Sequence, residues 1–300
     1  MKSLFEFLRP AAGRAWKNMR AVCSLQSCRN TLLIRSVPQR RTGINIGELW
    51  YCSVDCFLAA ARARLTSLTD GRVTEMPHNP RLSIGLVMLS KGYLTDEELR
   101  YAMNQSQLHG EDLESALVRL GLAGERQLTA ARAAQWGYPV LSQDRIGQAV
   151  EADIPQVLLN ACSAVPLHHS PSAKRFLLGF VHRVEYSLLQ SLEQISGFRA
   201  EPCFITPTDF ADQMERVSAA PAYKEVVIED QKTPAQMAKT VAGFALDIAA
   251  DDATFAQCRN YVWSRLSSKR HTIDVLFRVK TSRAAEAKRN SILLEDSVVG

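Results

Sequence analysis

The sequence predicts an α+β protein in which a tandem helical repeat packs with a small α/β layer, flanked by a small cysteine-rich N-terminal module and a C-terminal helix with a β-hairpin. Three observations support this class. A helical phrase occurs twice within residues 84–135, strand and helix patterns alternate over residues 137–219, and four of the seven cysteines precede residue 57. These patterns predict the following divisions: 1–22, 23–66, 67–80, 81–219 and 220–300.

Composition sets broad limits on the class of protein. The chain of 300 residues is 46% hydrophobic and 22% charged, enough for two or three small domains. Its formal net charge of +5 is mild, and no block of basic and aromatic residues indicates a nucleic-acid partner. Since the sequence has neither a secretory signal nor a run of roughly 18 apolar residues, we expect a cytoplasmic protein with reduced cysteines.

Residues 1–22 predict a basic amphipathic helix. Apolar residues such as Leu4, Phe7 and Trp16 recur at helical spacing, opposite Lys and Arg side chains. Such a helix can make peripheral contact with a membrane or lie in the groove of a partner. We prefer the simpler interpretation, an ordinary helix packed on its own domain.

Two cysteine pairs, Cys23 with Cys28 and Cys52 with Cys56, predict a structural zinc site. Cys56 falls in the first turn of a helix expected to run to about Leu65, where the helix dipole favours thiolates. Two short strands, TLLIRSV and INIGELWY, are expected between the pairs. Four thiolates can bind zinc tetrahedrally. So short a module has too small a core to be stable alone, and a bound metal ion would stabilise it. The alternative is four small buried hydrophobic residues without a metal.

The phrase Tyr51 to Cys56 resembles the C-terminal half of treble-clef-like zinc fingers such as the TRASH and MYND types. The first pair departs from that pattern, because four residues separate Cys23 from Cys28 where two are usual. The resemblance implies a zinc-finger-like module in which all four cysteines bind the metal. After it, residues 67–80 are polar and broken by Gly and Pro, so we expect a linker.

The helical phrase that repeats in residues 84–135 has a period of 29 residues, the distance from Gly92 to Gly121. Each copy predicts a helix, a glycine stop and a second helix. Thr95 and Glu98 predict a capping box for the second helix of the first copy, whereas the second copy has lost that cap. The superposed apolar pairs are Met88 with Leu117, Leu89 with Val118, Leu99 with Leu128 and Ala102 with Ala131.

Downstream, strands and helices alternate. GYPVL predicts a strand, QVLLNAC a helix, VPLHH and RFLLGFV strands, VEYSLLQSLEQIS a helix, FRAEPCFIT a strand, and Thr206-Pro207 a last helix. Beyond residue 219, Thr233-Pro234 begins another helix, and NYVWSRLSSKRHTIDVLFRVK predicts a β-hairpin. A lone hairpin is marginal in water, so we expect it to pack on the preceding helix or to extend the sheet of the middle domain.

The runs IGLVMLSKGYLTDEELRYAMNQ and LESALVRLGLAGERQLTAARAAQWGYPVL resemble the N-terminal domain of type II secretion and type IV pilus assembly ATPases, the GspE/MshE-type N domain. The family's tandem phrase is R-L-G-x-x-L-V-x-x-G-x-I-x-x-x-x-L-x-x-A-L-x-x-Q. The downstream segment from SAVPLHH to DQMERV resembles the second half of that domain, so the resemblance covers residues 80–217. It implies a unit that docks onto other assembly components at the inner membrane.

In pilus-type members of that family, the Arg and Gly at the head of each copy and the Gln at its end bind cyclic di-GMP. The resemblance assigns this site to four residues: Gly85, Gly92, Gly121 and Gln135. The sequence departs from the phrase with Ser83 and Asp112 at the Arg positions, Ser106 at a Gln position and Glu114 at a Gly position. Because two carboxylates would repel a ligand with two phosphates, we expect the repeat to pack helices rather than bind nucleotide.

No phosphate loop of the form G-x-x-x-x-G-K-[ST] occurs, and the roughly eighty residues after 219 are too few for a motor domain. We therefore expect no enzyme but an adaptor or regulatory protein that binds protein components of a secretion or pilus assembly machine. One alternative is a cyclic di-GMP receptor that uses the repeat. Another is a zinc-finger regulator that binds nucleic acid through the cysteine module and the turn Lys269-Arg270-His271.

Overall fold

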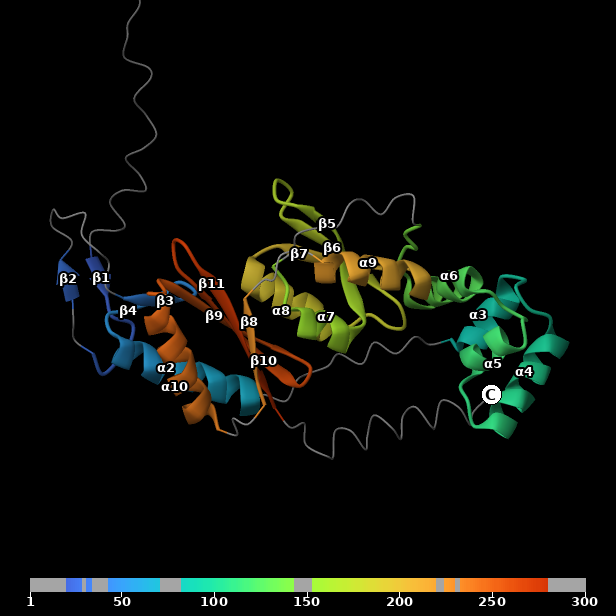
Figure 1. Ribbon diagram of the computed structural model, residues 1–300, viewed down its shortest axis with the longest axis horizontal. Helices are drawn as coiled ribbons and strands as arrows, with labels where there is room; N and C mark the ends of the chain where they lie inside the picture. The colour runs from blue at the N-terminus through green and yellow to red at the C-terminus, as the bar shows by residue number, and fades with distance from the viewer. Residues whose placement is uncertain are drawn as a thin grey trace, which may run out of the picture. The chain divides into compact units, whose positions relative to one another are not determined.

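The computed structural model describes residues 20–28, 31–33, 43–70, 82–142, 153–219, 224–229 and 233–279. They form two compact units (Figure 1). The discontinuous unit combines the described parts of Met1–Val73 and Lys224–Gly300, and the middle unit occupies Thr74–Tyr223. The predicted α+β class is confirmed, because both units combine helices with small sheets.

A six-stranded sheet organises the discontinuous unit, in the order β4-β3-β9-β10-β11-β8. The antiparallel pair of β10 and β11 confirms the predicted C-terminal hairpin, but it pairs with β9 rather than with the sheet of the middle unit. The strands are β3 (Ile44–Ile46), β4 (Leu49–Tyr51), β8 (Glu225–Ile228), β9 (Asp252–Cys258), β10 (Tyr261–Ser267) and β11 (Thr272–Arg278).

The N-terminal part of this unit departs from the sequence prediction in two details. INIGELWY is itself a hairpin of β3 and β4, because Gly47 turns the chain at φ +61°. Arg20–Val22 form β1, paired with β2 (Thr31–Leu33) in a two-stranded sheet, rather than the end of a helix. Residues 1–19 of the predicted amphipathic helix lie outside the described residues.

Helices α2 (Val54–Asp70) and α10 (Pro234–Asp247) lie together on one face of the six-stranded sheet (Figure 1). The structure thus joins in one hydrophobic core the segments that the sequence divided into 23–66 and 220–300. Helix α2 also runs through Asp70, into the predicted linker, and Leu68 of this extension packs against the same core. The hydroxyl of Thr69 donates to the Leu65 carbonyl at 3.0 Å within this last turn.

The tandem repeat folds as two helix pairs, as predicted. Gly92 and Gly121 end the first helix of each copy with the same φ of +68°. Three of the four superposed apolar pairs meet in one core, whereas in the fourth pair Leu89 packs against this core and Val118 is exposed. The four helices are α3 (Ile84–Ser90), α4 (Asp96–His109), α5 (Leu113–Arg119) and α6 (Glu125–Trp136).

A three-stranded sheet in the order β5-β6-β7 forms the α/β layer of the middle unit. Strand β6 pairs with β5 antiparallel and with β7 parallel, and α8 makes the crossover. GYPVL forms only an isolated bridge from Val140 to Phe204 instead of a strand. The elements are α7 (Gln156–Cys162), β5 (Ala164–Ser170), β6 (Arg175–Phe180), α8 (Tyr186–Ser196), β7 (Arg199–Phe204) and α9 (Pro207–Ala219). No helix among the described residues has the length and apolar character to cross a membrane.

Candidate metal site and helical repeat

The four N-terminal cysteines converge at one point of the discontinuous unit. Cys23 and Cys28 lie in the loop between β1 and β2, Cys52 follows β4, and Cys56 lies in the first turn of α2. Their sulfur atoms all lie within 4.8 Å of one another. The predicted ligand set is therefore brought together from two loops and one helix, and it can hold a metal ion.

The spacing of the sulfur atoms fits a tetrahedral thiolate site. A tetrahedron with metal–sulfur bonds of about 2.3 Å has sulfur–sulfur edges of about 3.8 Å. The observed separations are 3.6 Å from Cys28 Sγ to Cys52 Sγ and 3.8 Å from Cys52 Sγ to Cys56 Sγ. A disulfide would need about 2.05 Å, and these four cysteines form no disulfide in the described part of the chain.

Hydrogen bonds around Cys23 favour the thiolate that a metal requires. Burial acts to raise the pKa of this thiol, but backbone N–H groups of Cys52 and Leu25 and the thiols of Cys52 and Cys28 lower it to about 7. At Cys56 a hydrogen bond with the Ser53 side chain acts to lower the pKa, but burial and the thiols of Cys28 and Cys23 raise it above its usual value. One thiol of the cluster thus readily becomes an anion, and a bound cation would favour deprotonation of the others.

A backbone hydrogen bond and a glycine hold the loops of the cluster together. The Ser24 N–H donates to the Trp50 carbonyl at 2.9 Å and holds the first cysteine loop against β4. A Cβ added to Gly43 would clash with Trp50 Nε1 and would lie 2.7 Å from the Tyr51 carbonyl oxygen. Because the second contact is with backbone, no side-chain rotation relieves it. Gly43 therefore allows the start of β3 to approach the end of β4, the strand that leads into Cys52.

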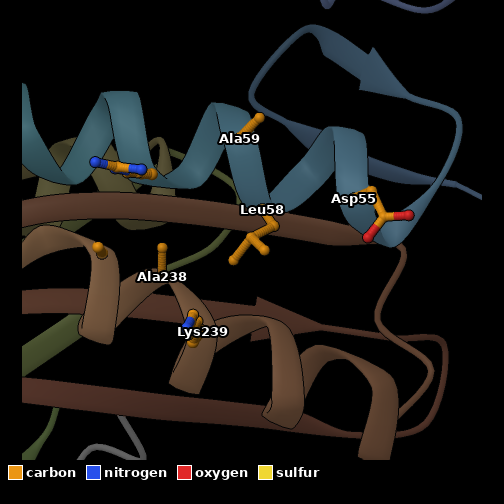
Figure 2. A pocket seen from close by; sticks show the side chains of 7 residues that line it. Asp55, Leu58, Ala59, Ala238 and Lys239 are labelled. Carbon is orange, nitrogen blue, oxygen red and sulfur yellow. The ribbon is translucent and has the colours of Figure 1, made fainter.

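A shallow groove separates α2 from α10 on the surface of the same unit (Figure 2). Its volume of about 240 Å³ is below the roughly 300–1,000 Å³ of typical ligand pockets. Asp55, Arg62 and Lys239 surround an apolar floor of Leu58 and three alanines, and among the described residues none of these three charges forms an ion pair. The groove is therefore smaller than a typical small-molecule site.

The four residues that the resemblance assigned to a nucleotide site all have roles within the repeat. A Cβ added to Gly85 would lie 2.9 Å from Leu99 Cδ1, so this glycine allows α3 to approach α4 closely. Gly92 and Gly121 end helices with positive φ. Gln135 Nε2 donates to the Leu82 carbonyl at 2.6 Å and so holds the start of α3 against the end of α6.

Residues at the family's arginine positions are helix caps in this chain. The Ser83 hydroxyl accepts from the Leu86 N–H at 3.4 Å, and Asp112 Oδ1 accepts from the Ser115 N–H at 3.0 Å. Burial acts to raise the pKa of Asp112, but the Ser115 N–H and hydroxyl donate to its carboxylate and bring the pKa below its usual value. Asp112 therefore begins α5.

The other predicted carboxylate, Glu114, forms an ion pair with Arg132 of α6. Arg132 is only 5% exposed and also donates to the Val181 carbonyl at the end of β6, at 2.5 Å. The sequence indicated that Glu114 would repel a nucleotide, but it did not indicate Arg132 as its partner. The available signal was a single arginine within the alanine run AARAA, on the buried face of a helix.

Comparison with known proteins supports the family resemblance. No protein-family model matches the chain. The chain is 28% identical over 129 residues to the type IV pilus assembly ATPase PilB of Thermus thermophilus, a match that spans 42% of this chain and 14% of PilB. The solved structure of MshE with cdg is similar with a TM-score of 0.38 and 19% identity, covering 45% of this chain and 99% of that one.

The N-terminal domain of XpsE is similar with a TM-score of 0.34 and 21% identity, covering 44% of this chain and 92% of that one. The match to PilB confirms the predicted resemblance to the N-terminal domain of secretion and pilus ATPases. This chain corresponds to only a small part of PilB's length.

Proposed function

We propose that this protein is a non-enzymatic adaptor whose middle unit binds a protein component of a type II secretion or type IV pilus assembly machine on the cytoplasmic side of the inner membrane. The observation that carries this proposal is the 28% identity to PilB over 129 residues. The interactions inside the repeat support it, because Ser83, Asp112 and Gln135 all serve its own helices. A docking role needs the folded repeat but no bound nucleotide.

The surface of the repeat also suits a protein partner. Large hydrophobic side chains that reach solvent are a feature of protein-binding surfaces where they lie together in one patch. Leu108 is 75% exposed near the end of α4, although its neighbours in the sequence are polar. The other exposed large hydrophobic residues of the repeat and the segment leading into it are Leu82, Leu86, Tyr101, Met103 and Val118.

Affinity purification from a host with pilus and secretion genes tests the adaptor proposal. We expect the tagged chain to recover an identified component of one of these machines. Leu108→Asp should reduce that recovery at least about tenfold, since an exposed apolar contact would be lost. Gln107→Asp, an exposed neighbour, is the matched control. Recovery of no such component by the wild-type chain would contradict the proposal.

For the cysteine cluster we propose a structural zinc ion. Four soft thiolates at tetrahedral spacing favour zinc, and they leave no open position for a reacting water. Elemental analysis of the purified chain should give one zinc per chain. Iron is the other metal that such a site holds, and its visible absorption would identify it. A chain purified under reducing conditions without metal would overturn this assignment.

The alternative function is a cyclic di-GMP receptor, since the repeat keeps four positions of the family's phrase. To bind this ligand, Gln135 would have to release the Leu82 carbonyl, and the buried Gly85 would have to become accessible. We expect no binding heat when cyclic di-GMP is titrated calorimetrically into about 50 μM protein, a concentration that detects micromolar affinity. A saturating signal that Gln135→Ala removes would replace the adaptor proposal.

A further inference from the structure

The metal cluster and the C-terminal strands share one hydrophobic core. Cys23 and Cys56 are buried in the same hydrophobic core as Met237 of α10 and Phe255 of β9. Among the described residues, the C-terminal part contributes no sulfur ligand. If the cysteine module loses its ordered structure, the effect therefore reaches the C-terminal part through the shared core and the shared sheet, and not through a metal ligand of that part.

A first path from the cluster runs through the sheet. Cys52 directly follows β4, which pairs with β3, and β3 pairs in parallel with β9. Both the backbone N–H and the side-chain amide of Asn45 donate to the Asp251 carbonyl, at 2.9 and 3.0 Å. Strands β3 and β4 have three residues each, and a hairpin of this length is not stable by itself in water.

A second path runs through α2. Cys56 lies in the first turn of this helix, where a bound metal ion would anchor it. The next buried positions, Phe57, Ala61 and Leu65, are all fully shielded from solvent. They pack in the core with Val241 of α10. If the first turn loses its anchor, α2 loses the constraint that presents this apolar face to α10 and to the sheet.

We propose that metal binding to the four N-terminal cysteines controls the folding of the C-terminal residues 234–278, so that the ion stabilises the whole discontinuous unit. This inference rests on the proposed metal site and goes beyond it by assigning the site control over strands that are distant in sequence. The free energy of metal binding becomes folding free energy where the ligands are held together only by the fold. The middle unit has its own core, and none of its described cysteines belongs to the cluster.

Hydrogen exchange followed by mass spectrometry tests this proposal on the full chain, with zinc bound and after chelation. We expect slow amides of β10 and β11 to exchange at least about tenfold faster after chelation, together with those of α2. Amides of β6 should not change, and they serve as the internal reference. An increase confined to residues 20–70 would overturn the proposal.

A pair of cysteine variants separates metal loss from the effect of the chelator. Cys28→Ala removes a half-buried ligand that packs against the shared core from outside, whereas Cys258→Ala removes a buried thiol of β9 that is not one of the four ligands. We expect Cys28→Ala to lose zinc and to deprotect β10 and β11, while Cys258→Ala keeps zinc.

The metal content measured on the same samples distinguishes the two proposals. A wild-type chain that binds no metal would overturn both the zinc assignment and this inference. A wild-type chain that binds one zinc, but whose C-terminal strands exchange equally with and without it, would overturn only the inference.

Discussion

Arg132 occupies the position that Met103 holds in the first copy of the repeat, and the two side chains have different surroundings. Met103 is exposed on α4, whereas Arg132 is buried on α6 and contacts Glu114 and the Val181 carbonyl. The second copy thus uses a charged residue to join its helices to the α/β layer. Breaking a buried ion pair leaves one charge without its partner, which is more costly than losing an exposed pair.

We predict that Arg132→Met lowers the free energy of unfolding by about 2 kcal/mol, less than is usual for a buried pair, because Glu114 keeps partial access to water. Denaturant titration at neutral pH measures this change. The exposed Arg126→Met on the same helix should change stability by less than about 0.5 kcal/mol. Equal effects of the two variants would show that Arg132 contributes no specific interaction.

The lowered pKa of Asp112, the cap of α5, predicts that the free energy of unfolding depends on pH in the acidic range. Its folded pKa is lowered, so its carboxylate contributes stability above the unfolded value of about 3.9, and that contribution disappears as the pH falls through the folded pKa. Asp112→Asn keeps a capping side chain without the charge. It should therefore be less stable than wild type at pH 7 and indistinguishable from it below the folded pKa. Chemical denaturation across acidic pH, with Glu97→Gln as control, measures the difference.

At the scale of helices, the two copies of the repeat begin their second helix with different caps. Thr95 and Glu98 form the full reciprocal box at α4, with the Thr95 N–H donating to Glu98 at 2.8 Å. At α6, Gln127 still accepts from the Gly124 N–H at 2.9 Å, so half of the box remains. The sequence suggested complete loss of this cap, because a glycine at the cap position hides the role of the residue three positions later.

We predict that Gly124→Ser stabilises the protein by about 0.5–1 kcal/mol, because the hydroxyl supplies the missing acceptor and the unfolded chain loses freedom. The backbone allows it, since Gly124 has φ −88° and an added Cβ would have only Gln127 Oε1 nearby, at 3.7 Å. The converse change, Thr95→Ala, should cost about 1 kcal/mol. Thermal unfolding of both variants measures these effects, and a destabilised Gly124→Ser would contradict them.

Elements that depend on neighbouring residues could be predicted from the sequence, whereas the pairing of strands that are distant in sequence could not. The helix pairs of the repeat follow from periodicity around Gly92 and Gly121, and the C-terminal hairpin follows from alternation on both sides of a polar turn. The parallel pairing of β3 with β9 joins residues 206 positions apart at Asn45 and Asp251. Neither a three-residue strand pattern nor composition indicates such a partner, so the shared sheet was missed.

At the scale of the whole molecule, the middle unit interrupts the sequence of the discontinuous unit but not its fold. The two halves that surround it complete one sheet and one core, whereas the helices and strands of residues 82–219 complete their own. Domains tolerate insertions where both ends of the inserted chain leave at the surface. Each unit should then fold without the other, even though one of them is split in sequence.

We predict that a shortened chain, with residues 20–81 joined directly to residues 220–279, still folds and binds one metal ion. The retained segments 71–81 and 220–223 can reach roughly 50 Å when extended. This exceeds the size of a unit of roughly 100 residues, whose radius of gyration is about 13 Å. Hydrogen exchange should show protected amides in β10 and β11 of the joined chain. A chain of residues 20–81 alone should lack stable structure, because Phe57 and Leu65 lose the core that they pack against. A joined chain that stays unfolded with metal present would show that the middle unit is needed for the fold of the split one.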